Sequence, residues 1–123
     1  QTPITVCLLN NYYLGMVRQM QQLFYGKRYS ATCLRRRKGC PEHCKGPNEK
    51  CPPYVPDFMK WAESYGAHGI GVTKEEDIIP ALEAAKQNTD APTVIEFMVA
   101  TEEIVLPMVP GGNPMNNMIL KSK

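Results

Sequence analysis

The sequence predicts an α/β protein whose parallel sheet is covered by flanking helices. Three observations support this: strand-like and helix-like segments alternate, the first strand is almost continuously apolar, and helix-capping and helix-ending residues separate the segments. Only three strands are visible, whereas a doubly wound sheet usually has about five or six. The predicted architecture is therefore half of a larger α/β fold.

The first predicted unit is a strand followed by a helix. Residues 4–9 form an apolar, β-branched run, which predicts a strand buried on both faces. An apolar stripe of an amphipathic helix follows, ended by Gly26, and we interpret most methionines of the chain, with Met16 as the exception, as core residues. The members of the stripe are Met16, Val17, Met20, Leu23 and Phe24.

The second half predicts a helix, a strand, a helix and a strand. Asp57 is the expected N-cap of a helix that ends at Gly66. Residues 68–72 and 93–99 are expected strands, and residues 105–109 an extended segment. Between the strands, Thr73–Glu76 fits a capping box, and Pro80 moves the expected helix start toward Asp77. The expected inward faces of the two helices are Phe58, Trp61, Ala62 and Tyr65, then Ile78, Leu82 and Ala85.

Composition is that of an ordinary globular domain. The chain has 123 residues, 43% of them hydrophobic, and 14 basic against 12 acidic side chains. That hydrophobicity argues against disorder, and no apolar run approaches the roughly 18 residues that span a membrane. The chain starts with Gln1 rather than Met, lacks a signal-peptide pattern and reaches apolar sequence by Ile4. We therefore expect a piece of a longer protein that does not act at a membrane.

Residues 27–56 have no helical or strand period and contain a basic, cysteine-rich stretch. Six basic and two acidic side chains lie between the first and last of four cysteines, spaced C-x6-C-x3-C-x6-C: Cys33, Cys40, Cys44 and Cys51. Four thiolates in a basic loop can hold Zn²⁺ or an iron–sulfur cluster. Two disulfides or four thiols remain open alternatives. Without interleaved aromatic residues, the basic patch argues against nucleic-acid binding.

The junction after the first strand is the first candidate site, because ligands of open α/β sheets bind at the carboxyl ends of strands. Asn11 supplies a neutral oxygen that suits Mg²⁺, and Gly15 allows close approach of a cofactor to the backbone. Local pattern alone favours the alternative in which Asn10 and Asn11 form a turn and Gly15 serves packing.

Five ordered motifs give the chain a resemblance to a known family. They are L-N-N-x-x-L-G-M-V-R-Q, L-F-Y-G-K-R-Y-S-A-T, P-D-F-x-K-x-A-E-x-Y-G-A-H-G-I-x-V-T-K, V-I-E-F-x-V and V-L-P-M-V-P-G-G. Together they resemble the C-terminal part of the thiamine-diphosphate-binding domain of the acetolactate synthase (acetohydroxyacid synthase) catalytic subunit. The resemblance covers residues 1–123 as one portion of that domain, apart from an insertion at about residues 33–53.

The resemblance implies a cofactor site at the first junction. Asn11 would bind Mg²⁺ through its side chain and Tyr13 through its backbone carbonyl. The residues implied to line the thiamine diphosphate are Leu14, Gly15, Met16 and Val17. Residues 23–32 and the tail from Val105 resemble mobile segments that close over the active site. Met20 departs from the family, which usually has Trp there, and the run Pro107–Gly112 is shortened.

The resemblance also implies what lies outside this chain. The activating glutamate, the first half of the diphosphate motif and the domain that holds FAD belong to parts of the family absent here, so we expect the isolated chain to be inactive. The parent would decarboxylate pyruvate and join the product to a second 2-oxo acid in branched-chain amino-acid biosynthesis. A homodimer or larger assembly, a possible regulatory subunit, and a cytoplasmic location (organellar in a plant or fungus) are implied. The alternatives are another thiamine-diphosphate carboligase or decarboxylase, and a metal-binding interaction module built on the cysteine loop.

Overall fold

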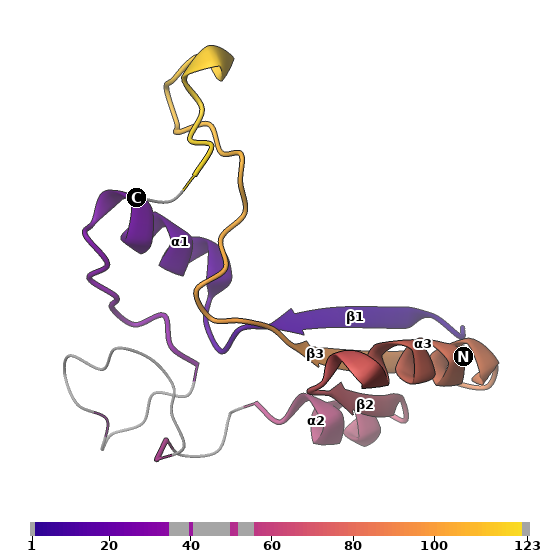
Figure 1. Cartoon of the computed structure of the whole chain (residues 1–123). Coiled ribbons are helices and arrows are strands. Elements are labelled where there is room, and N and C mark those ends of the chain that lie inside the picture. Colours follow the sequence, from indigo (N-terminus) through magenta and orange to yellow (C-terminus); the bar gives the residue numbers. More distant parts are fainter. Residues whose placement is uncertain (1, 35–39, 41–49, 52–55, 122–123) are drawn as a thin grey trace.

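A computed structural model describes residues 2–34, 40, 50–51 and 56–121 of the chain. Within these residues three parallel strands form one sheet in the order β1-β3-β2 (Figure 1). The strands are β1 (Thr5–Asn10), β2 (His68–Val72) and β3 (Thr93–Met98). The predicted fold class, a parallel sheet with flanking helices, is confirmed, and the predicted bounds of β2 are those observed.

The core lies where helices α2 (Phe58–Ser64) and α3 (Ile78–Gln87) pack on β2 and β3. Its buried members are Val72, Ala81, Ala85 and Ile95. Asp57 caps α2 as predicted, accepting a hydrogen bond from the Lys60 backbone N at 3.2 Å. Trp61 and Tyr65 are exposed, with ring centroids 5.3 Å apart in a tilted arrangement, so the prediction that they face inward is wrong, and Ala62 is the buried residue of the helix.

The start of α3 differs in detail from the prediction. A 3-10 turn, η1 (Glu75–Asp77), precedes the helix, and no side chain caps it. The predicted capping box at Thr73 is therefore wrong. The predicted helix start near Asp77 is confirmed, since α3 begins at Ile78. Proline is tolerated only in the first turn of a helix, so Pro80 requires a start close to this point. Ala81 takes the inward position that was predicted for Leu82, which is 39% exposed.

In this section of chain taken alone, strand β1 is exposed over most of its length, so the prediction of burial on both faces is wrong for the section. Val6, Cys7 and Leu9 are exposed, and only Asn10 at the end of the strand is buried. The reason is positional: β1 is an edge strand that pairs with β3, while α2 and α3 lie on β2 and β3. The apolar run predicted a strand correctly, but strand neighbours determine burial.

Helix α1 (Gly15–Phe24) lies beyond the carboxyl end of β1 rather than over the sheet (Figure 1). Its predicted apolar stripe faces largely outward, with Met16 77% and Val17 49% exposed. Arg18 and Gln19 are the buried residues of the helix instead. Placing Met20 in the core is wrong as well, since it is half-buried and lines a cleft described below. Among the described residues, no helix combines the length and apolar character needed to cross a bilayer.

Two glycines of β2 provide a matched test of how closely α2 packs on the sheet. A Cβ on Gly69 would lie 3.0 Å from both the Cα and the carbonyl O of Met59, whereas a Cβ on Gly71 would meet nothing within 4 Å. We expect Gly69→Ala to lower the free energy of unfolding by about 1–3 kcal/mol through overpacking. Gly71→Ala should leave it unchanged or raise it by up to about 1 kcal/mol. Urea unfolding of both variants checks this, and equal effects would contradict the packing described.

Candidate functional site

The chain bends sharply where β1 ends. The Oδ1 atom of Asn10 accepts a hydrogen bond from Tyr12 N at 2.8 Å, and Oδ1 of Asn11 accepts one from Tyr13 N at 3.0 Å. Tyr12, which follows the two asparagines, adopts a positive φ of 66°. Two successive asparagine turns therefore fix the bend, which confirms the turn interpretation of these residues. The prediction that Asn11 and Tyr13 bind Mg²⁺ stays a prediction.

A neighbouring segment supports the bend by backbone pairing. Leu14 N donates to Thr32 O at 2.9 Å and Leu34 N donates to Tyr12 O at 2.8 Å, which places Tyr13 opposite Cys33 in an antiparallel bridge. Tyr13 is consequently 7% exposed. The loop after α1 thus holds the turn from one side.

The N-terminus of α1 is open to solvent. No side chain caps it, and its first turn holds no acidic residue. Leu14, Met16 and Val17 are all exposed there. Helix N-termini carry unpaired N–H groups and a partial positive charge, which favour a bound anion. The residues predicted to line a diphosphate therefore occupy an uncapped helix start.

Gly15 lies directly against Asn11. A Cβ at Gly15 would sit 3.4 Å from Asn11 Nδ2, in contact with the amide. Both residues line a cleft of about 410 Å³ between α1 and the segment that follows β3, which we call the C-terminal segment (residues 101–109). The other lining residues are Met16, Gln19, Met20, Glu103, Val105, Pro107 and Met108. The cleft opens at the carboxyl end of β1, where α/β proteins bind ligands.

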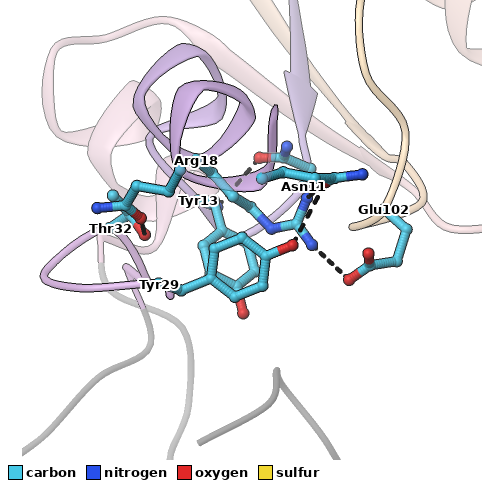
Figure 2. Close-up of polar contacts among 8 residues, drawn as sticks. Asn11, Tyr13, Arg18, Tyr29, Thr32 and Glu102 are labelled. Carbon is cyan, nitrogen blue, oxygen red and sulfur yellow. Dashed lines mark hydrogen bonds and ion pairs between the residues drawn. The ribbon is translucent and has the colours of Figure 1, made fainter. Parts of the chain in front are cut away.

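Next to the cleft residue Gln19 in the sequence, Arg18 packs against two tyrosine rings (Figure 2). Its guanidinium carbon is 4.8 Å from the centre of the Tyr13 ring and 4.4 Å from that of Tyr29. Arg18 is 1% exposed and forms an ion pair with Glu102 of the C-terminal segment. Its Nε has no hydrogen-bond partner among the described residues. Arg18 thus links the turn, the loop after α1 and the C-terminal segment.

The surroundings of Tyr29 raise the pKa of its hydroxyl above its ordinary value. Burial raises the pKa of its hydroxyl, and the nearby Arg18 cation offsets only part of that effect. The protonated hydroxyl donates to Gln22 Oε1 at 3.3 Å, and Arg18 donates to the same oxygen at 3.1 Å. Sequence reasoning missed this cluster. Its signal in the sequence is Arg18 on the face of α1 opposite the apolar stripe, but nothing local indicates Glu102.

The predicted four-cysteine metal site cannot be placed in full. Cys33 pairs with Tyr13, and Cys40 and Cys51 are half-buried, but Cys44 lies outside the described residues. In the described ranges no group of three or more His, Cys, Asp or Glu side chains gathers as metal ligands would. Zn²⁺ or iron–sulfur binding by the cysteines therefore stays a prediction.

Comparison with known proteins identifies the family. Residues 1–97 match the family described as "Thiamine pyrophosphate enzyme, C-terminal TPP binding domain". The chain belongs to this family. The bend, the uncapped helix start and the cleft all lie within or beside the matched region, so the candidate site is part of a thiamine-pyrophosphate-enzyme domain.

Several acetolactate synthases are similar to this thiamine-pyrophosphate-enzyme chain. The large subunit from Corynebacterium glutamicum is 41% identical over 90% of this chain and 16% of its own length. The mitochondrial enzyme of Schizosaccharomyces pombe is 36% identical over 96% of this chain and 15% of its own length. The isozyme 2 large subunit of Escherichia coli is 34% identical over 98% of this chain and 19% of its own length. The chain thus spans less than a fifth of these relatives.

The residues present fit the diphosphate end of the cofactor that names the family. The N-terminus of α1 lacks any side chain that would compete with a phosphate for its N–H groups. Asn11 presents a neutral amide oxygen, which accepts from Tyr13 N and has a second lone pair for a hard cation. Gly15 leaves the space beside that amide unfilled by a Cβ.

Proposed function

We propose that this chain is the C-terminal section of a thiamine-diphosphate- and Mg²⁺-dependent acetolactate synthase large subunit. The observation that carries the proposal is the junction of β1 and α1. There, an asparagine turn, an uncapped helix start and a cleft coincide within or beside the matched cofactor-binding region. The similarity to acetolactate synthases from bacteria and a fungus supports the choice of this activity over other carboligases and decarboxylases of the family.

In this proposal the junction holds the cofactor by its diphosphate. Asn11 Oδ1 and the Tyr13 carbonyl bind Mg²⁺, and the α1 N-terminus binds phosphate oxygens next to Leu14, Gly15, Met16 and Val17. The exposure of α1 at these four residues supports this assignment. When bound, thiamine diphosphate supplies the electron sink for decarboxylating a 2-oxo acid such as pyruvate. The C-terminal segment forms one wall of the cleft and helps to keep water from the reacting atoms.

The complete enzyme would need parts that this chain does not supply. We infer a homodimer or larger assembly, FAD bound by a different domain, and a possible regulatory subunit, in branched-chain amino-acid biosynthesis in the cytoplasm or an organelle. These inferences rest on the family and on the share of the relatives that the chain covers. The isolated chain should bind Mg²⁺ and thiamine diphosphate weakly and have no activity.

Activity of the full-length gene product tests the proposal. With pyruvate, Mg²⁺ and thiamine diphosphate it should form acetolactate, and omitting the thiamine diphosphate should abolish product. A second experiment uses a chimera, in which this chain replaces the matching part of the Corynebacterium glutamicum large subunit. The two sequences are 41% identical over that part. Acetolactate from either protein supports the proposal. A folded chimera and a folded gene product that both fail to consume pyruvate would overturn it.

A further inference from the structure

Gln19 pairs with the backbone of the C-terminal segment through both ends of its side-chain amide. Its Nε2 donates to Val105 O at 3.0 Å, and its Oε1 accepts from Val105 N at 2.8 Å. The same Nε2 lies 3.6 Å from Met108 Sδ. One buried side chain therefore satisfies the donor and the acceptor of one residue, as a neighbouring strand would.

The pairing holds Val105 by its main chain and not by burial of its side chain. The Val105 side chain is 78% exposed, so burial of this side chain does little to keep the residue in place. The second attachment nearby is the ion pair of Arg18 with Glu102, whose carboxylate is 60% exposed and therefore weakened by solvent. The two bonds of Gln19 are consequently the better-shielded attachment of the C-terminal segment to α1.

Gln21 makes the same kind of paired hydrogen bonds to the loop after α1, on the other side of the helix. Its Nε2 donates to Ser30 O at 3.0 Å and its Oε1 accepts from Ser30 N at 3.2 Å. Two glutamines of one helix thus each hold one backbone residue of a flanking segment. Because the two glutamines hold different segments, a substitution at one serves as the control for the same substitution at the other.

We propose that Gln19 is a positioning residue that fixes the C-terminal segment as the wall of the cleft opposite Asn11 and Gly15. Val105, Pro107 and Met108 form that wall, and Gln19 itself lines the cleft beside them. Gln19 thereby sets the width of the cleft that a bound ligand enters. Its effect on catalysis rests on the proposed function, whereas its hold on the segment does not.

Amide hydrogen exchange in the full-length gene product measures the hold directly. Gln19→Ala removes the acceptor of Val105 N, so exchange at this amide should accelerate about tenfold, as expected for loss of two hydrogen bonds. Gln19→Glu keeps an acceptor for Val105 N but places a second acceptor against Val105 O. Its exchange rate should lie between those of the wild type and Gln19→Ala.

Gln21→Ala is the matched control. It should accelerate exchange at Ser30 N and leave Val105 N unchanged, while Gln19→Ala does the reverse. Unchanged exchange at Val105 in Gln19→Ala would overturn the proposal, and so would equal acceleration of both amides in both variants, which indicates general loosening. These outcomes need no activity, so they are independent of whether the gene product is a synthase.

A kinetic arm tests the width of the cleft. In an active gene product, Gln19→Ala should raise KM for pyruvate about fivefold through loss of a positioned wall, with the half-saturating Mg²⁺ concentration unchanged because Asn11 is untouched. An unchanged KM would overturn the role in positioning the wall. A change in Mg²⁺ dependence instead would show that Gln19 acts on the metal site, which would also overturn it.

Discussion

Asn11→Ala in the full-length gene product is expected to raise the Mg²⁺ concentration for half-maximal acetolactate formation at least 10- to 100-fold. The variant removes the amide oxygen that we assign to the metal, and that oxygen also accepts the Tyr13 N hydrogen bond at the turn. Initial rates measured against Mg²⁺ concentration at saturating thiamine diphosphate provide the test.

Two variants separate the metal role of Asn11 from its turn role. Asn10→Ala breaks the equivalent turn bond to Tyr12 N but removes no proposed ligand, so it should lower stability without altering Mg²⁺ dependence. Asn11→Asp keeps an oxygen for both the turn and the cation, and should recover most of the lost Mg²⁺ affinity. If Asn10→Ala and Asn11→Ala shift Mg²⁺ dependence equally, Asn11 serves only the turn.

Arg18→Ala should be the most destabilising substitution on α1, with a loss of about 2–4 kcal/mol in the free energy of unfolding. Arg18 is 1% exposed and packs against the rings of Tyr13 and Tyr29, so alanine leaves a void and removes both ring contacts. It also removes the hydrogen bond to Gln22. Urea unfolding of the full-length gene product, monitored by tyrosine absorbance and by circular dichroism, measures the loss in the free energy of unfolding.

Glu102→Ala is the comparison for Arg18→Ala. Its carboxylate is 60% exposed, so water replaces much of what the ion pair supplies, and we expect a loss of at most about 1 kcal/mol. The rings and Gln22 continue to contact Arg18 in that variant. Equal losses in the two variants would contradict the view that the tyrosine rings, rather than the carboxylate, hold this cation.

The sequence patterns predicted where helices and strands lie better than they predicted which faces of these elements are buried. The bounds of β2 and the start of α2 were predicted correctly, and the signal for α2 is local, because the Asp57 side chain reaches Lys60 N in the first turn of the helix. Burial depends on which elements become neighbours. The apolar run of β1 therefore predicted a strand but not an exposed edge strand, and the stripe on α1 predicted a helix but not its orientation.

The candidate site likewise has a part that could be predicted from local sequence and a part that could not. The asparagine turn and the glycine beside it were predicted from types of residue that form turns and bind cations. The polar cluster around Arg18 was not, because Arg18 and Glu102 lie 84 residues apart in the sequence. Gln19 and Val105 are separated by 86 residues, and nothing in either local sequence indicates the other. Such pairs become visible only when the chain has folded.

A crystal structure of the full-length gene product with thiamine diphosphate and Mg²⁺ tests the central claim most directly. The account predicts a cation about 2.0–2.1 Å from both Asn11 Oδ1 and the Tyr13 carbonyl oxygen, with phosphate oxygens at the N-terminus of α1. Replacing Mg²⁺ by Mn²⁺ would identify the cation by its anomalous signal at the same place. A cation and diphosphate bound away from residues 11–17 would contradict the account.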